Sequence, residues 1–184
     1  MPNWVFNTLT IEGPREKLEE LTKKAHLSGD IDEPDECCLS FKNFLPYPNG
    51  VWDYSWCVSN WGTKWDACAP DLEDGGGQDI LYSFSTAWSP PTPVIKKMIE
   101  TYPELSFSHY YEEPGCDFQG EYEGSNGEVT LDICECYHPE CAECCLRDYP
   151  TDECEYDEEI GDWLCPNCYI ALNESQEWDE ETNE

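Results

Sequence analysis

The sequence predicts an α+β protein in which one antiparallel sheet is covered on one face by two helices, followed by a small cysteine-rich module. Two observations support this prediction. Over about the first 133 residues, segments with apolar residues at every second position alternate with segments of helical spacing. After that point the periodicity ends and cysteines become frequent. The chain of 184 residues therefore divides into a regular domain and an irregular one.

The first predicted elements are a strand, a helix and a second strand. Apolar and polar residues alternate over residues 5–11, which predicts a strand. Pro14 then opens a segment whose apolar residues follow helical spacing to about His26. Residues 41–65 are rich in proline and aromatic residues, and within them we expect the second strand near residues 56–60.

The next predicted elements are a strand, a helix and a further strand. Alternation over residues 80–87 predicts the strand. Thr92 and Pro93 have the residue types of an N-cap and a first turn, and the apolar stripe that follows predicts a helix to about Tyr102. Alternation returns over residues 105–111 and predicts another strand.

A hairpin completes the predicted domain. Ser125-Asn126-Gly127 separates two alternating segments, and Asn-Gly is the strongest short-range signal for a tight β-turn. The predicted order is β-α-β-β-α-β with an added hairpin, which is the ferredoxin-like arrangement. We expect this domain to occupy residues 1–133.

Four N-terminal motifs resemble those of the YubB ferredoxin-like domain family, which occurs on bacteriophages, prophages and plasmids. The resemblance covers roughly residues 1–130. It implies a ferredoxin-like fold without an iron–sulfur cluster and an origin on a mobile element, and it implies no particular reaction. The motifs are Met1-Pro2-Asn3-Trp4 with Asn7-Thr8-Leu9-Thr10-Ile11-Glu12-Gly13, Asn60-Trp61-Gly62-Thr63-Lys64-Trp65-Asp66-Ala67, Thr86-Ala87-Trp88-Ser89-Pro90-Pro91 and Tyr111-Glu112-Glu113-Pro114-Gly115.

The charge of the chain is extreme and uneven. There are 41 acidic and nine basic residues, for a formal net charge of −32. Residues 1–111 hold 17 acidic and eight basic side chains, whereas residues 112–184 hold 24 acidic side chains and a single basic one, Arg147. A field of this sign repels nucleic acid and anionic membranes and attracts basic surfaces. We therefore expect a protein partner with a basic surface, and neither direct nucleic-acid binding nor membrane binding.

The 13 cysteines bear on location and on metal binding. The N-terminus has no pattern of a signal peptide, and no stretch approaches the 18 apolar residues of a membrane helix. We therefore expect a cytoplasmic protein of a bacterial host. In a reducing cytosol, clustered cysteines are more often metal ligands than disulfides.

The strongest metal signal is a pair of C-x₂-C motifs in residues 134–172. The motifs are Cys141 with Cys144 and Cys165 with Cys168, and twenty residues lie between Cys144 and Cys165. Each motif forms a tight turn that directs two thiolates at one ion, and four such ligands suit tetrahedral zinc. Four protein ligands leave no open position for water, so we expect a structural zinc ion that supplies much of the folding energy of this module.

A second ion is an open alternative. Cys134, Cys136 and His138 lie close together in the sequence, and Cys154 or Cys145 could complete a second set of four ligands. The sequence does not decide between one ion and two.

The loop between the two C-x₂-C motifs is acidic over residues 148–162. It is either a solvated surface or a fixed carboxylate surface that imitates DNA or binds another basic protein surface. The last residues, 173–184, are polar and acidic, and we expect them to be disordered. The candidate partner-binding residues in the loop are Glu153, Glu155, Asp157, Glu158 and Glu159.

A third feature is aromatic. Trp61, Lys64, Trp65 and Trp88 either pack against the sheet or form a pocket in which a base or a partner side chain stacks. No P-loop, nucleophile elbow or H-E-x-x-H motif is present, so we expect no enzymatic activity.

Two functions therefore remain. The first is a mobile-element protein that inhibits a host defence or DNA-processing protein through an acidic, DNA-mimicking surface. The second is a non-catalytic adaptor or regulator that binds a nucleotide or a peptide at the aromatic pocket.

Overall fold

The structure, a computed structural model, describes residues 2–26, 37–135, 153–157 and 162–170. The chain divides into two compact units, Met1–Cys134 and Glu135–Glu184. The first unit contains a six-stranded sheet with helices, and the second contains a two-stranded sheet.

The sheet of the first unit is antiparallel and has the strand order β2-β3-β1-β4-β5-β6. Its first four strands have the order of a ferredoxin-like domain, and the hairpin β5–β6 extends the sheet beyond β4. The ferredoxin-like fold expected from the periodicity is confirmed. The strands are β1 (Trp4–Glu12), β2 (Cys68–Glu73), β3 (Asp79–Ala87), β4 (Ser106–Glu113), β5 (Phe118–Ser125) and β6 (Glu128–Glu135).

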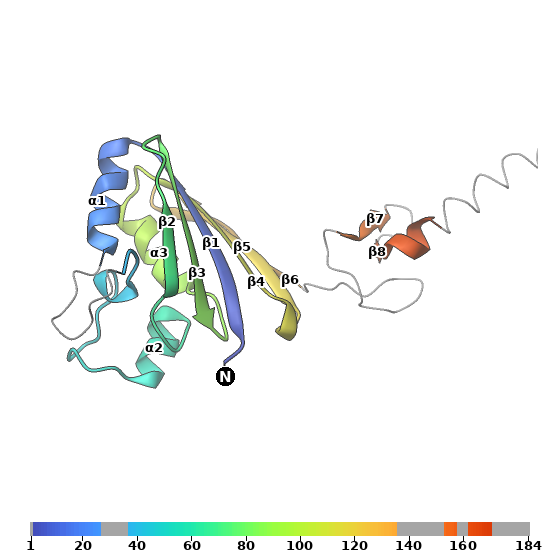
Figure 1. Ribbon diagram of the computed structural model, residues 1–184, viewed down its shortest axis with the longest axis horizontal. Helices are drawn as coiled ribbons and strands as arrows, with labels where there is room; N and C mark the ends of the chain where they lie inside the picture. Colours follow the sequence, from blue (N-terminus) through green and yellow to red (C-terminus); the bar gives the residue numbers. More distant parts are fainter. Residues whose placement is uncertain (1, 27–36, 136–152, 158–161, 171–184) are drawn as a thin grey trace, which may run out of the picture. The chain divides into compact units, whose positions relative to one another are not determined.

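Three helices lie on one side of this sheet (Figure 1): α1 (Arg15–Ala25), α2 (Tyr54–Trp61) and α3 (Thr92–Thr101). Two short 3-10 turns, η1 (Phe41–Asn43) and η2 (Pro114–Cys116), complete the described elements of the unit. The sequence predicted α1 and α3, and α2 is additional. None of the described helices is both long enough and apolar enough to cross a membrane.

The prediction of a strand near residues 56–60 is wrong, because this segment is the helix α2. The Asp53 carboxylate accepts a hydrogen bond from the Trp56 backbone N–H at 2.7 Å and caps the helix. Gly62 ends the helix in the left-handed conformation, with φ 82°. Cys57 and Trp61, four residues apart, are both fully buried, which fits a helical face. The second strand of the fold is β2, further along the chain.

The start of α3 also differs from the prediction. The N-cap position is Pro91 and not Thr92, and no side chain caps the helix there. Pro91 and Pro93 both have fixed φ angles, which set the path into the first turn without a hydroxyl cap.

The core lies between the sheet and the helices. Leu9 and Ile11 of β1 are fully buried together with Leu18 of α1 and Ile95 of α3. Trp61 closes this core from α2, because its ring is fully buried and its Nε1 donates to the Leu45 carbonyl at 2.9 Å. The helix side of the sheet is therefore a packed surface.

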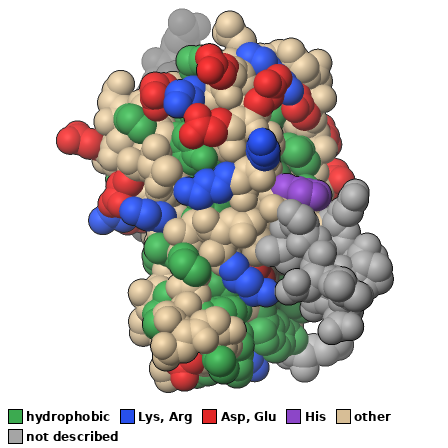
Figure 2. All heavy atoms as spheres, turned by 90° about the vertical axis from the view of Figure 1, so that its left-hand side faces the viewer, with side chains coloured by type: hydrophobic (Ala, Val, Ile, Leu, Met, Phe, Trp, Pro, Cys, Tyr) green, Lys and Arg blue, Asp and Glu red, His purple; other side chains and the backbone are tan. Residues whose placement is uncertain are grey.

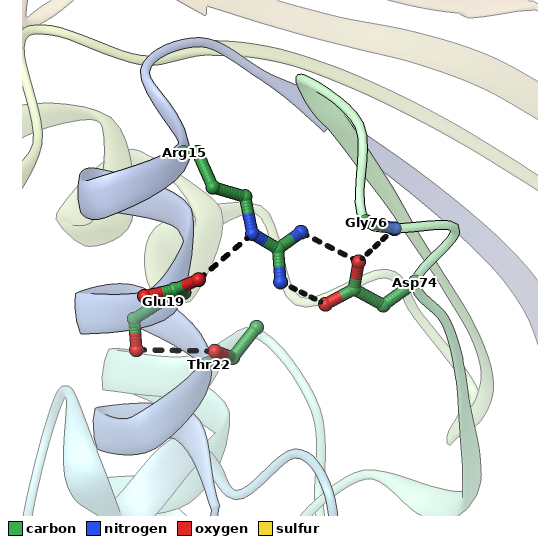
Figure 3. Close-up of polar contacts among 5 residues, drawn as sticks. All are labelled: Arg15, Glu19, Thr22, Asp74 and Gly76. Carbon is green, nitrogen blue, oxygen red and sulfur yellow. Dashed lines mark hydrogen bonds and ion pairs between the residues drawn. The ribbon is translucent and has the colours of Figure 1, made fainter.

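An exposed ion pair ties α1 to the turn between β2 and β3 (Figure 3). Arg15 donates from Nη1 and Nη2 to the two carboxylate oxygens of Asp74, at 2.6 and 2.8 Å, and from Nε to Glu19 at 3.0 Å. The Gly76 N–H also donates to Asp74 at 2.9 Å. The Arg15 guanidinium holds the pKa of Asp74 down at about 2. This network connects α1 to the turn between β2 and β3 at the surface.

The second unit contains the hairpin of β7 (Glu155–Asp157) and β8 (Asp162–Leu164). Tyr156 pairs with Trp163 across it, and their rings lie edge to face with centroids 5.5 Å apart. Leu164 and Cys165 are buried and form a small core, and residues 166–170 continue as a helical turn. Cys168 packs against this core from that turn.

Candidate protein-binding face

One face of the six-stranded sheet faces away from the helices, and we call it the open face. In β1, Val5 and Leu9 point to the helices and are fully buried, whereas the alternate residues Phe6, Thr8 and Glu12 are exposed. The register between neighbouring strands carries this alternation across the sheet. No described helix covers this second face.

The open face is rich in carboxylates and hydroxyls. Serine and threonine side chains line its middle, among them Thr10, Ser106, Ser108 and Thr130. The alternation and the strand register place nine acidic residues on it, namely Glu12, Asp71, Glu73, Asp79, Glu112, Glu121, Glu123, Glu128 and Asp132.

Basic residues lie elsewhere in the described part of the first unit. The strand residues of the open face include no lysine and no arginine. Figure 2 views the helix side, where lysine and arginine side chains are interspersed with acidic ones. Several of these form ion pairs along a helix, such as Lys17 with Glu20 at 2.9 Å. The fold therefore separates a mixed-charge side from a purely acidic one. The basic residues are Arg15, Lys17, Lys23, Lys24, Lys42, Lys64, Lys96 and Lys97.

Two aromatic side chains stand on the open face among the carboxylates. Phe6 is 56% exposed and pairs across the strands with Glu112. Tyr110 is 37% exposed, and its hydroxyl lies 3.1 Å from Glu112 and 3.2 Å from Gln119. Exposed aromatic rings surrounded by polar groups are typical anchors of protein interfaces.

A shallow cavity of about 260 Å³ opens on the same face near the end of β1. Its polar lining consists of hydroxyls and carboxylates, including those of Thr10, Glu12, Ser108 and Glu123. Such walls accept hydrogen bonds and carry negative charge, so the cavity suits a cationic side chain better than an anion or an apolar group.

The predicted zinc ligands lie partly outside the described residues. Cys165 is buried at the end of β8, and Cys168 lies half-buried in the turn that follows. The Tyr169 N–H donates to the Cys165 carbonyl at 3.0 Å, so the C-x₂-C segment forms a compact turn. Cys141 and Cys144 are outside the described residues. Within the described residues no three metal-binding side chains converge, so zinc binding stays a prediction.

The ligands of the predicted second ion belong to two different units or lie outside the described residues. Cys134 is exposed near the end of β6 in the first unit, and Cys154 is half-buried just before β7 in the second. Cys136, His138 and Cys145 are outside the described residues. The second ion therefore remains a prediction as well.

The predicted acidic loop contains the hairpin of the second unit. Glu153 and Glu155 are exposed, and Asp157 ends β7. Glu158 and Glu159 are outside the described residues. The described part of the loop is therefore structured, as in the fixed-surface alternative, and its pairing of β7 with β8 was not predicted from the sequence.

The predicted aromatic pocket does not form as expected, because Trp61 is buried in the core. Lys64 and Trp65 are adjacent at the surface, with the ammonium 4.5 Å from the Trp65 ring centroid and 6.0 Å from that of Tyr54. Trp88 is 52% exposed and has a φ of 73°. The four residues thus do not line one pocket.

His109 is a fully buried ionisable group, and its environment is that of a core residue. Its ring stacks on Phe84, and its Nε2 lies 3.1 Å from the Asn7 side-chain oxygen. Burial lowers the pKa of His109 to about 3, so the ring is neutral in the folded protein.

The acidic open face was missed from the sequence, although a signal for it was present. Within each predicted strand, acidic residues are separated by two or four positions and therefore share one face. The pairs are Glu121 with Glu123 and Glu128 with Asp132. Counting charge by halves of the chain directed attention to the C-terminal loop. Counting charge by strand face would have shown that these carboxylates share one face of their strands.

The comparisons with known proteins agree with the fold. Residues 52–162 match the model of the family described as the ferredoxin-like domain in Api92-like protein. No curated protein matches the sequence. These matches support the ferredoxin-like fold implied by the YubB resemblance, and they do not test the YubB relationship itself.

A solved structure shows the same fold. It is the crystal structure of the protein api92 from Yersinia pseudotuberculosis, with a TM-score of 0.59 and 8% sequence identity. The similarity covers 72% of this chain and 98% of the other. At this identity the match supports the fold alone. Since the family model spans more than half of the chain, the protein belongs to the family of the ferredoxin-like domain in Api92-like proteins.

Proposed function

We propose that this chain is a non-catalytic binding protein whose open face docks on a basic surface of a partner protein. The observation behind this proposal is the separation of charge in the first unit. Nine carboxylates gather on the open face without a lysine or arginine among its strand residues, while the basic side chains of the described residues come from helices, turns and loops.

Electrostatics favours a basic partner in two ways. A face that carries only negative charge attracts a basic protein from a distance and orients it before contact. The backbone that carries these carboxylates is ordered in advance, so binding costs side-chain freedom but little backbone freedom. Phe6 and Tyr110 then supply apolar contact area inside the acidic surface.

The class of partner follows from the chemistry of the face. Rows of fixed carboxylates resemble a nucleic-acid backbone in charge, so a DNA-binding surface of a host protein is a suitable target. We propose that the chain comes from a mobile element, acts in the host cytoplasm, and inhibits a defence or DNA-processing protein by occupying that surface.

The second unit has a supporting role in this proposal. A structural zinc ion on Cys141, Cys144, Cys165 and Cys168 would hold the acidic hairpin in shape. Support comes from the compact turn at Cys165 and Cys168, where one thiol is buried and the other half-buried. Replacing both residues by Ser should release one zinc ion per chain, measured by mass spectrometry of the intact protein. An unchanged metal content would contradict the assignment.

The experiment that tests the proposal compares three sets of four substitutions, each of which removes four negative charges. Acidic residues are replaced by their amides on the open face, on the helix side or in the C-terminal hairpin loop. Binding to basic DNA-binding proteins captured from a bacterial lysate is then measured at low and high salt, with DNA as competitor. The sets are Glu12, Glu112, Glu121 and Glu123; Glu16, Glu19, Glu20 and Glu100; and Glu155, Asp157, Glu158 and Glu159.

We expect the open-face set to weaken binding at least about tenfold and the helix-side set to change it less than about twofold. Binding of the unchanged protein should weaken steeply with salt and should compete with DNA. Affinity that does not change with salt contradicts the electrostatic mechanism. Loss of binding only in the hairpin-loop set would place the partner on the second unit instead.

A second candidate function rests on the surface beside α2, which we call the α2 aromatic surface and which consists of Trp52, Tyr54, Lys64 and Trp65. Trp52 is 46% and Tyr54 is 54% exposed, and the Lys64 ammonium lies against the rings of Tyr54 and Trp65. Figure 2 shows apolar side chains gathered toward the bottom of the helix side, the end at which Figure 1 places α2. This surface suits a planar or anionic ligand such as a nucleotide, or an acidic peptide.

Fluorescence separates this candidate from the first. Titration with nucleotides should quench tryptophan emission in the unchanged protein, and Lys64→Ala should weaken that response about tenfold. The open-face set serves as the control and should respond like the unchanged protein. No response to nucleotides or acidic peptides would leave the open face as the sole candidate.

A further inference from the structure

The two edge strands of the sheet, β2 and β6, differ in whether a further strand can pair with them. The edge strand β2 has Pro70 in its middle and a register shift between Cys68 and Asp71, and Ala69 has a φ of 47°. A proline and an irregular register interrupt the row of backbone donors and acceptors, which is how natural sheets block their edges. The β2 edge is therefore protected.

The opposite edge, β6, lacks these protections. It has eight residues without proline or glycine, and no described strand pairs with its outer side. Asn126 and Gly127 before it have φ angles of 53° and 78°, the signature of a tight two-residue hairpin turn. Antiparallel alternation after such a turn directs the backbone N–H and C=O groups of Val129 and Leu131 outward, whereas the Ile133 carbonyl faces inward.

The strand β6 is also firmly attached to the sheet. The Tyr111 hydroxyl, which comes from β4, reaches across β5 and donates to the Ile133 carbonyl at 3.2 Å. It passes over Gly120, where a Cβ would overlap both the hydroxyl and that carbonyl. Val129 packs against the main core. The outer edge of β6 therefore offers backbone groups at Val129 and Leu131, and the strand is held to the sheet at Ile133.

The side chains of β6 define what fits beside it. Glu128 and Asp132 point to the open face, and Glu121 and Glu123 of the neighbouring β5 lie on the same face. Ile133, on the other side of the strand, is 44% exposed. A second copy of this chain would place like charges opposite each other, which disfavours pairing of two β6 strands. A basic strand would instead form favourable cross-strand pairs.

We propose that β6 accepts an extended segment of the partner as a seventh strand, with lysine or arginine side chains on the open face and small apolar side chains beside Ile133. This inference rests on the proposed function, because it names the part of a basic partner that makes the contact. Backbone hydrogen bonds would supply affinity, and the carboxylates would select basic side chains.

The test uses the full-length protein and a synthetic peptide of about eight residues, the length of β6, in which lysine alternates with valine and threonine. Amide hydrogen exchange is measured residue by residue with and without the peptide. A control peptide has the same sequence with N-methyl groups at alternate residues, which removes backbone donors and keeps the charge. We expect the first peptide to slow exchange in residues 128–135 and to bind at least about tenfold more tightly than the control.

A matched pair of variants tests the role of charge without altering the backbone. Glu128→Gln with Asp132→Asn should weaken the peptide about threefold to tenfold, whereas Glu16→Gln with Glu20→Gln, on the exposed side of α1, should change its affinity less than about twofold. Equal binding of the two peptides, or slower exchange only outside β6, would overturn strand addition. In that case salt-sensitive peptide binding would still support the open face, whereas salt-insensitive binding would contradict the proposed function as well.

Discussion

The two sides of the first sheet are built from the same strands and have opposite properties. On the helix side the strand residues are mostly apolar and buried, and the charged residues on the helices above them include both signs. On the open face the strand residues are hydroxyls, carboxylates and a few exposed rings. One side therefore stabilises the fold and the other is available for binding, and substitutions on the two sides should separate these roles.

The largest expected effect comes from replacing a phenylalanine by alanine on each side of the sheet in turn. Phe107 of β4 is buried on the helix side and Phe6 of β1 is exposed on the open face. We expect Phe107→Ala to lower the free energy of unfolding by about 3–5 kcal/mol, because it leaves a cavity in the core. Phe6→Ala should change it by less than about 1 kcal/mol. Urea denaturation measures both, and equal losses would contradict the assignment of the two faces.

The next largest effect concerns crowding on the helix side of β5. At Gly120 a methyl group would overlap the Tyr111 hydroxyl and the Ile133 carbonyl, whereas a methyl group on Gly75 meets no atom within 4 Å. We expect Gly120→Ala to destabilise the protein by about 2–3 kcal/mol. Gly75→Ala, the matched control, should stay within about 0.5 kcal/mol. A tolerated Gly120→Ala would show that Tyr111 does not hold β6 as described.

The third effect is a dependence of stability on pH that originates in the buried side. Burial lowers the pKa of His109 to about 3 from a usual 6.5, so between these values the unfolded chain binds a proton that the folded chain does not. Stability should therefore fall as the pH drops below 6.5, by up to about 1.4 kcal/mol per pH unit.

The control for this prediction is His109→Gln, which keeps an amide near Asn7 and does not titrate. The carboxylates of the open face titrate in both proteins, so the difference between them isolates His109. The measurement is urea denaturation at pH 7 and pH 5. Equal changes in the two proteins would contradict the buried, neutral state of His109.

The smallest expected effect belongs to the ion pair between Arg15 and Asp74. Both side chains are in contact with solvent, and exposed ion pairs contribute little to stability because water and salt screen them. Arg15→Ala should therefore leave the melting curve nearly unchanged while raising the pKa of Asp74 from about 2 toward its ordinary value. Carboxyl titration followed by NMR measures this shift, and an unchanged pKa of Asp74 would contradict the network.

Much of the fold followed from local patterns in the sequence. Period-two alternation located β1, β3 and β4, an apolar stripe located α1 and α3, and Asn126-Gly127 located the hairpin of β5 and β6. These elements were predictable because their signals lie within a few residues of one another. The spacing of the C-x₂-C motifs likewise makes zinc binding a prediction that needs no tertiary information.

Only the tertiary structure decided the nature of α2, the burial of Trp61 and the side of the sheet that the helices leave open. A short aromatic segment suits a strand or a helix equally well, and the Asp53 cap and the packing of Cys57 and Trp61 select the helix. Alternation shows which residues share a face of a strand. Which face of the sheet becomes the core depends on contacts between residues far apart in the sequence, and those contacts exist only in the folded chain.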